Sequence, residues 1–350
     1  MLVYISAIII CFFFGMITEK LEGRNSIVLK LVPMITLFII SAIRYNVGID
    51  YSGTYTDVYY WVVSGFKNIR MDAGLLWLYR VIVFFGLNLQ WIFVITSFII
   101  NLYIFKSIEK ISSDKKLSYL IYICSTFYFF GMNGIRQAIS MALFYFSLNY
   151  IPEKKWVKFI VTNLIGALFH ETALLFIPLY YLILHRFKSK KTYIAIACAI
   201  FFATPFLVPI IVNVLKNTRY VLYFLNNNYS AMNSINLSAI INIIFCVLFI
   251  IKIDLKDKSK EGTLAFSFFI CHYVGVILTA FMTSIPLILR IFESFRFIDF
   301  LSIPYLLKDY KGKNKLLIYI FVVIFYLAYF IYHIFLNNAN GVLPYTTIFG

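Results

Sequence analysis

The stretch TYIAIACAIFFATPFLVPIIVNVL, residues 192–215, contains no charged side chain. A helix needs about 20 mostly apolar residues to cross the hydrocarbon core of a bilayer, so this run is long enough to span a membrane. Comparable apolar runs lie at residues 1–17, 26–43, 89–105, 117–132, 135–151, 156–169, 171–184, 236–252, 263–283, 288–307 and 316–336. We therefore predict an all-α polytopic integral membrane protein, with residues 1–350 forming one transmembrane domain of about twelve helices.

The composition of the whole chain agrees with this prediction. Of its 350 residues, 62% are hydrophobic and 13% are charged, against about 45–50% and about 25% in an average soluble domain. These values exclude a soluble enzyme, a nucleic-acid-binding protein and a disordered protein. The 5 cysteines all lie inside apolar runs without close spacing, so neither a disulfide framework nor a metal site is expected.

The basic residues predict the orientation of the chain. The loops at 18–30, 106–116, 152–158, 185–191, 252–260 and 308–315 hold 22 of the 31 lysines and arginines. They alternate with loops that are poor in basic residues, as expected if they face the cytoplasm. The first apolar run has no basic segment before it, so we predict a retained first helix whose N-terminus lies outside.

Lysine and arginine are distributed differently between the two sides. The predicted cytoplasmic loops hold 20 of the 22 lysines, whereas seven of the nine arginines lie elsewhere: Arg44, Arg70, Arg80, Arg136, Arg219, Arg290 and Arg296. Either residue can set topology, but only arginine offers a planar fork that binds phosphate at two points. We therefore predict a phosphate-bearing ligand on the outer side.

The external loop 44–73 begins with the sequence RYNVGIDYSGTY, which carries Arg44, Asp50, Tyr51 and Tyr55. If the chain turns helical near Asp50, the two tyrosines share one helical face. Aromatic rings beside carboxylates are typical of sugar-binding sites, although an interfacial aromatic belt would explain the tyrosines equally well. The apolar stretch 74–87 is too short to span, and we expect an interfacial or re-entrant segment that contributes to the active site.

A second polar group, Asn133-Gly134-Ile135-Arg136-Gln137, interrupts two apolar runs. Asn133 and Gly134 can end one helix and leave Arg136 in the first turn of the next. A helix N-terminus favours anions, and an arginine there strengthens this preference. Asn133, Arg136 and Gln137 share one helical face, so we predict an anion-binding site at this junction.

His170 and Glu171 lie at a third break, between residues 156–169 and 171–184. A lone histidine in a helical protein often has only a structural role. Here it stands beside Glu171 at a helix start on the predicted outer side, where protonation can be tuned. We expect a catalytic or ligand-contacting role.

The fourth polar group is Arg290-Ile-Phe-Glu293-Ser-Phe-Arg296. The spacing lets Glu293 pair with either arginine, which would lower the cost of placing them in a membrane. Two cations against one acid still leave a net positive site, suited to a phosphate contact by the second arginine.

These segments, in this order, resemble the EpsG family of polysaccharide polymerases, which belongs with the Wzy-type O-antigen and exopolysaccharide polymerases. The matching pieces are the segments 44–55, Asn133-x2-Arg136-Gln137, Phe169-His170-x-Thr172-Ala173 and 290–296, with Pro344-Tyr345 near the C-terminus. The resemblance implies a GT-C-like membrane glycosyltransferase at the outer face of the bacterial cytoplasmic membrane. Such an enzyme moves a growing glycan from undecaprenyl pyrophosphate onto the sugar of a lipid-linked repeat unit.

The resemblance also implies roles for the residues. His170 is the first choice for the base that deprotonates the acceptor, and Asp50 is the second. Arg136 and either Arg290 or Arg296 would bind pyrophosphate, while Arg44 would bind the same ligand or orient Asp50. Sugar-binding roles are expected for Tyr51, Tyr55, Asn133, Gln137, Glu171 and Glu293. No cofactor or metal is expected, and the partners would be undecaprenyl-pyrophosphate-linked oligosaccharides, membrane lipid and a chain-length regulator protein.

Two other functions are compatible with parts of the pattern. A flippase for lipid-linked oligosaccharides would also need arginines, but around a cavity that opens to each side in turn, and the halves of the chain show no repeat. A membrane acyltransferase could use a lone histidine but would give the arginines no role. We therefore favour the polymerase, with the flippase as the alternative.

Overall fold

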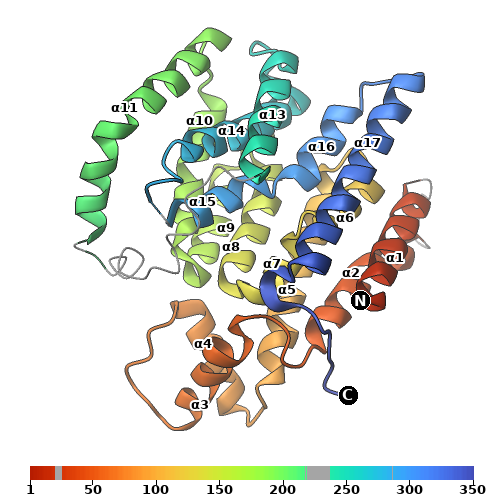
Figure 1. Ribbon diagram of the computed structural model, residues 1–350, viewed down its shortest axis with the longest axis vertical. Helices are drawn as coiled ribbons and strands as arrows, with labels where there is room; N and C mark the ends of the chain where they lie inside the picture. Colours follow the sequence, from red (N-terminus) through yellow and green to blue (C-terminus); the bar gives the residue numbers. More distant parts are fainter. Residues whose placement is uncertain (20–25, 217, 219–236, 286) are drawn as a thin grey trace. The chain divides into compact units, whose positions relative to one another are not determined.

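A computed structural model describes residues 1–19, 26–216, 218, 237–285 and 287–350 (Figure 1). The described residues form helices and connecting turns, with no β-strand among them, which confirms the predicted all-α class. Their only isolated β-bridge joins Arg44 to Thr347. Lys20, Arg24 and Arg219, which entered the charge analysis, lie outside the described residues.

The helices follow the predicted apolar runs closely. Their bounds are α1 Leu2–Thr18, α2 Ser26–Ala42, α3 Asp57–Val63, α4 Ala73–Phe84, α5 Gln90–Ile111, α6 Lys115–Cys124, α7 Phe127–Asn133, α8 Ile135–Ser147, α9 Trp156–Phe169, α10 Ile177–Leu184, α11 Lys190–Lys216, α13 Leu237–Lys252, α14 Lys260–Thr279, α15 Leu287–Arg296, α16 Asp299–Leu307 and α17 Gly312–Phe330. Short π or 3-10 helices include η1 Tyr51–Thr56, η3 Glu171–Phe176, η6 Ile331–Leu336 and η7 Ala339–Gly341.

Two runs that we expected to be continuous are each divided into two helices. The run 117–132 breaks after α6, where Thr126 adopts φ +74. This left-handed conformation is unfavourable for a β-branched residue, and no glycine or proline marks the break in the sequence. The run 288–307 is divided into α15 and α16.

Among the described residues, four helical segments are long and apolar enough to cross a membrane by length and composition: α5, α11, α14 and the continuous segment Gly312–Leu336. Six more apolar helical segments of 10–17 residues accompany them, including Leu2–Thr18 and Trp156–Phe169. These helices are consistent with a membrane protein.

The chain forms two compact units, which we describe separately. The first comprises Met1–Tyr150, Trp156–Ile177 and Asp299–Gly350, and the second comprises Ile151–Lys155 and Pro178–Ile298. In the first unit α1 packs against α2 and α6, and α8 packs against α5 and α9. In the second, α14 packs against α13 and α15.

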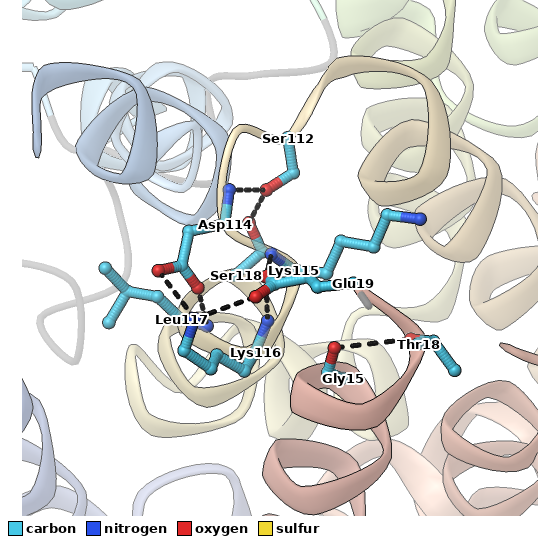
Figure 2. A network of polar contacts seen from close by, with 9 residues as sticks. All are labelled: Gly15, Thr18, Glu19, Ser112, Asp114, Lys115, Lys116, Leu117 and Ser118. Carbon is cyan, nitrogen blue, oxygen red and sulfur yellow. Dashed lines mark hydrogen bonds and ion pairs between the residues drawn. The ribbon is translucent and has the colours of Figure 1, made fainter. Parts of the chain in front are cut away.

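A polar network joins the last turn of α1 to the first turn of α6 (Figure 2). Glu19 accepts hydrogen bonds from the backbone of Lys115 and from Nζ of Lys116, the latter over 2.8 Å. Gly15 allows the two helices to approach closely, because an added Cβ atom would lie 2.8 Å from Cα of Lys116. Two lysines of the predicted cytoplasmic loop 106–116, Lys115 and Lys116, thus lie at the C-terminal end of α1.

Candidate functional site

The loop 44–73, which we predicted to be external, lies directly on the junction between α7 and α8. The backbone N–H of Asp50 donates to Oδ1 of Asn133 over 2.8 Å. Gly48 has φ +106, and a Cβ atom there would lie 3.0 Å from the carbonyl oxygen of Met132. Only glycine combines this backbone conformation with so close an approach. The Gly48–Asp50 segment and Asn133, far apart in sequence, therefore form one local structure.

Tyr55 is the second link between the loop and the junction. Its hydroxyl donates to the carbonyl oxygen of Asn133 over 2.6 Å and accepts from the backbone N–H of Ile135 over 3.1 Å. Burial raises the pKa of Tyr55, so its hydroxyl stays protonated and able to donate near neutral pH. Tyr79 in α4 in turn donates to the carbonyl oxygen of Tyr55 over 2.9 Å.

Tyr51 and Tyr55, for which we predicted sugar contacts, lie in the interior of the first unit. Their exposed fractions are 6% and 1%. Tyr51 stacks on Phe93 with ring centroids 4.6 Å apart, and Tyr55 meets the same ring edge-on. The chain is helical after Asp50 as expected, first as η1 and then as α3, but in this structure both rings hold the loop in place.

The predicted helix junction is confirmed. Asn133 ends α7, Gly134 alone separates the two helices, and Arg136 lies in the first turn of α8. The guanidinium of Arg136 is partly exposed, at 34% for the side chain. Gln137, one residue further, is buried at 4%. The junction therefore presents one cation at the N-terminus of a thirteen-residue helix.

Arg136 has an ionic partner that the sequence did not indicate. Its Nη1 atom lies 2.6 Å from Oδ2 of Asp72, the residue before α4. Asp72 directly precedes the helix α4, and an aspartate at this position usually caps the helix. Its place in the sequence therefore indicates a helix cap and not an ion pair. The pair connects the C-terminal end of the loop 44–73 to the junction.

His170 lies between the end of α9 at Phe169 and the start of η3 at Glu171, at the predicted break. Its Nδ1 atom lies 2.7 Å from Oγ1 of Thr172, which fixes the orientation of the ring. A Cβ atom on Gly74, near the start of α4, would lie 2.9 Å from the carbonyl oxygen of Leu168. Because Asp72 directly precedes α4, this close packing brings the end of α9 next to the segment that carries the partner of Arg136.

Glu171 follows His170 as the first residue of η3 and is partly buried. This short helix packs against both α8 and α9. Together, Asp50, Asn133, Arg136 and His170 therefore come from elements of the first unit that pack on one another.

Arg44 is placed differently from Arg136. Its exposed fraction is 1%, its Nη1 atom donates to the carbonyl oxygen of Ser41 over 3.1 Å, and its guanidinium lies 4.7 Å from the ring centroid of Phe93. Its Nε and Nη2 atoms have no hydrogen-bond partner. Burial lowers the pKa of Arg44 to about 10, so it remains charged at neutral pH.

The end of the chain, residues 340–348, forms a C-terminal strap across the start of the loop 44–73. Tyr345 anchors it by donating to the carbonyl oxygen of Ile40 over 2.8 Å, and Tyr4 of α1 donates to the carbonyl oxygen of Val342 over 3.0 Å. Backbone hydrogen bonds run from Tyr45 to Thr346, from Ile348 to Ile43, from Gly48 to Gly341 and from Ile49 to Asn340. The strap therefore supports the segment that carries Arg44 and leads to Asp50.

An apolar groove of about 750 Å³ runs along α1. Side chains of α1, α6, α17 and η6 line it, from Met1 and Phe335 to Met16, and all of them are apolar. The groove wall adjoins the strap, because Phe330 in its lining stacks on Phe129, which meets the ring of Tyr4.

The late arginines belong to the second unit. Arg290 is exposed, whereas Arg296 is 4% exposed and its guanidinium lies 4.0 Å from the ring centroid of Phe297. Glu293 is partly buried on the same helix. Among the described residues, no cluster of three or more histidine, cysteine, aspartate or glutamate side chains could hold a metal ion.

The fold and the site define an all-helical protein with apolar helices consistent with a membrane location and a cation-bearing helix junction in its first unit. The model of the EpsG family matches residues 27–347, nearly the whole chain, and the protein belongs to this family. Family membership indicates a polysaccharide polymerase-like enzyme of the glycosyltransferase kind. Neither a curated protein nor a solved structure matches the chain.

Proposed function

We propose that the protein is a polysaccharide polymerase that transfers a growing glycan from undecaprenyl pyrophosphate to the sugar of a lipid-linked repeat unit. The single observation that carries this proposal is Arg136 in the first turn of α8, partly exposed and held by Asp72. The helix N-terminus and the guanidinium both favour a diphosphate, which is the leaving group of the reaction.

In the proposed reaction, the acceptor hydroxyl oxygen attacks the anomeric carbon of the donor glycan. The bond between this carbon and the pyrophosphate oxygen breaks, and the leaving group takes the electron pair. Arg136 stabilises the negative charge that develops on the pyrophosphate, which is electrostatic preorganisation. The acceptor proton passes to a base, and the glycan grows by one repeat unit.

His170 is our first choice for this base, and Asp50 is the second. Thr172 fixes the His170 ring, and Asn133 fixes the backbone of Asp50, so both groups are held in place. Asn133 of α7, Gln137 of α8 and Glu171 of η3 are proposed to contact sugar. Because the rings of Tyr51 and Tyr55 pack on Phe93, we propose that the two tyrosines hold the segment that carries Asp50 in place.

Arg44 is proposed to orient the Asp50 segment, because its buried guanidinium lies over Phe93, the ring on which Tyr51 stacks. For the second unit, we propose Arg290 or Arg296 as a further phosphate ligand, with Glu293 as its neutralising neighbour or as a sugar contact. A GT-C-like arrangement with about twelve spans in the bacterial cytoplasmic membrane and the site on the outer face completes the proposal.

The apolar groove supports a lipid-linked substrate. We propose that it accepts part of the isoprenoid chain of the carrier, because its lining is wholly apolar and its wall adjoins the strap beside the first external loop. A chain-length regulator protein is proposed as a partner of the enzyme.

The test is reconstitution of the purified protein into proteoliposomes with lipid-linked repeat units as the only substrate. A polymerase lengthens the glycan without ATP or a nucleotide sugar, because the pyrophosphate linkage is already activated. Movement of the lipid-linked unit across the bilayer without lengthening would establish the flippase instead. Boiled protein and protein-free vesicles are the controls for spontaneous movement.

A further inference from the structure

Asp72 is the acidic residue that the structure adds to the site. Its Oδ2 atom lies 2.6 Å from Nη1 of Arg136, and the exposed fractions of the two side chains are 15% and 34%. Exposed ion pairs contribute little to the stability of a fold, so a purely structural account of this partly exposed pair is weak.

The carboxylate of Asp72 is not used for the local role that its position offers. Asp72 directly precedes α4 with extended backbone angles, φ −61 and ψ 140, yet it makes no side-chain hydrogen bond to the first turn of that helix. An aspartate in this position usually accepts such a bond. Its carboxylate reaches instead to Arg136, which lies 64 residues further along the chain.

Contacts with residues outside α4 hold this helix in place, and they thereby fix the position of the Asp72 carboxylate. Gly74 packs so closely on the end of α9 that a Cβ atom would lie 2.9 Å from the carbonyl oxygen of Leu168. Tyr79, one turn further along α4, is fully buried and donates to the carbonyl oxygen of Tyr55. Two contacts therefore fix the helix that presents Asp72 to Arg136.

A guanidinium can bind an oxyanion along more than one edge, each made of two N–H groups. Asp72 contacts Nη1, which leaves Nε and Nη2 as the edge suited to two phosphate oxygens. We propose that Asp72 is a positioning residue: it holds Arg136 by Nη1 so that the Nε–Nη2 edge receives the diphosphate of the lipid carrier. This inference rests on the proposed function, from which it takes the ligand.

The test compares Asp72→Ala, Asp72→Asn and Asp72→Glu with the wild-type enzyme in the reconstituted polymerisation assay. Asp72→Ala is expected to raise KM for the lipid-linked donor by about tenfold or more. The change in kcat is expected to be smaller, because the substitution weakens binding of the donor more than it slows the reaction of the bound donor. Asp72→Glu is expected to recover part of the loss, since it restores the charge. Asp57→Ala, which removes another acid of the same loop, is the matched control and should leave KM unchanged.

A second background shows whether Asp72 acts through Arg136. In the Arg136→Lys background, Asp72→Ala is expected to raise KM by less than about a further threefold, because the guanidinium that Asp72 would position is already absent. If the two effects multiply, or if Asp72→Ala lowers KM, the positioning role is overturned. The second result would mean that Asp72 competes with the diphosphate. Asp72→Asn, which preserves the shape of the side chain, provides the comparison if Asp72→Ala does not fold.

Binding of farnesyl diphosphate to the detergent-solubilised full chain separates this inference from the proposed function. Weaker binding to Asp72→Ala than to wild type, in a protein that does not polymerise, would reject the function and keep the positioning role. Polymerisation by the wild type with equal binding to both proteins would reject the positioning role alone.

Discussion

The backbone N–H of Asp50 donates to Oδ1 of Asn133 over 2.8 Å, although 83 residues separate them in sequence. This hydrogen bond joins the loop 44–73 to the junction that carries Arg136. It makes Asn133 part of the architecture of the site, whatever else Asn133 contacts when substrate is bound.

Asn133→Ala is expected to loosen the Asp50 segment. Loss of one partly buried hydrogen bond costs about 1 kcal/mol, and the midpoint of thermal unfolding in detergent should fall accordingly, together with polymerisation activity. Asn133→Asp keeps an acceptor oxygen and should preserve more of the stability than Asn133→Ala. Equal unfolding midpoints for the wild type and Asn133→Ala would show that the bond contributes nothing.

Arg136→Lys is expected to lose most of the polymerisation activity, although it keeps the positive charge. Lysine lacks the planar fork and cannot bind a phosphate along a two-nitrogen edge. Arg80→Lys, on the exposed face of α4, is the matched control and should retain normal activity. Polymer yield from reconstituted vesicles is the measurement, and a near-normal yield from Arg136→Lys would remove Arg136 from phosphate binding.

His170→Ala is expected to lower kcat by at least about 10²-fold if the imidazole is the base. Thr172→Val removes the hydroxyl that orients the ring and should give a smaller decrease in kcat. Single-turnover rates with saturating lipid-linked donor measure the effect. A decrease of less than about tenfold for His170→Ala would transfer the role of base to Asp50.

Tyr345→Phe tests the C-terminal strap. It removes the hydrogen bond to the carbonyl oxygen of Ile40 and is expected to cost about 1 kcal/mol, with reduced activity because the strap supports the loop that leads to Asp50. Tyr60→Phe, an exposed tyrosine of the same loop, is the control. A variant with unchanged stability and activity would show that the strap does not depend on this anchor.

Leu327→Trp tests the proposed lipid groove. The larger side chain would occupy part of the groove that Leu327 lines, so binding of an undecaprenyl-linked donor should weaken, whereas binding of a short isoprenoid donor should change less. Phe321→Trp, on the exposed face of α17, is the control. Equal losses for both chain lengths would place the isoprenoid chain elsewhere.

Much of the fold could be predicted from the sequence, because the apolar runs report directly which segments avoid water. The ends of α9 and α13 lie within one residue of the predicted bounds. The break at Thr126 escaped prediction, since a threonine in a left-handed conformation depends on its surroundings rather than on its own preference.

The site was only partly visible in the sequence. Asn133, Arg136 and His170 stood out because polar residues interrupt apolar runs there. Asp72 did not, because an aspartate before a helix has a common local explanation as a cap. The internal position of Tyr51 and Tyr55 was equally hidden, since tyrosine suits a sugar, a membrane interface and a packed interior.

The sequence by itself determined the all-α class, the approximate helix bounds and the helix junction with its arginine, because hydropathy and helix-ending residues act locally along the chain. Only the tertiary structure decided that Asp72 pairs with Arg136, that Asn133 holds Asp50 and that the C-terminal strap crosses the first loop. These contacts join residues dozens to hundreds of positions apart, and packing of the intervening helices, which no local pattern encodes, brings them together.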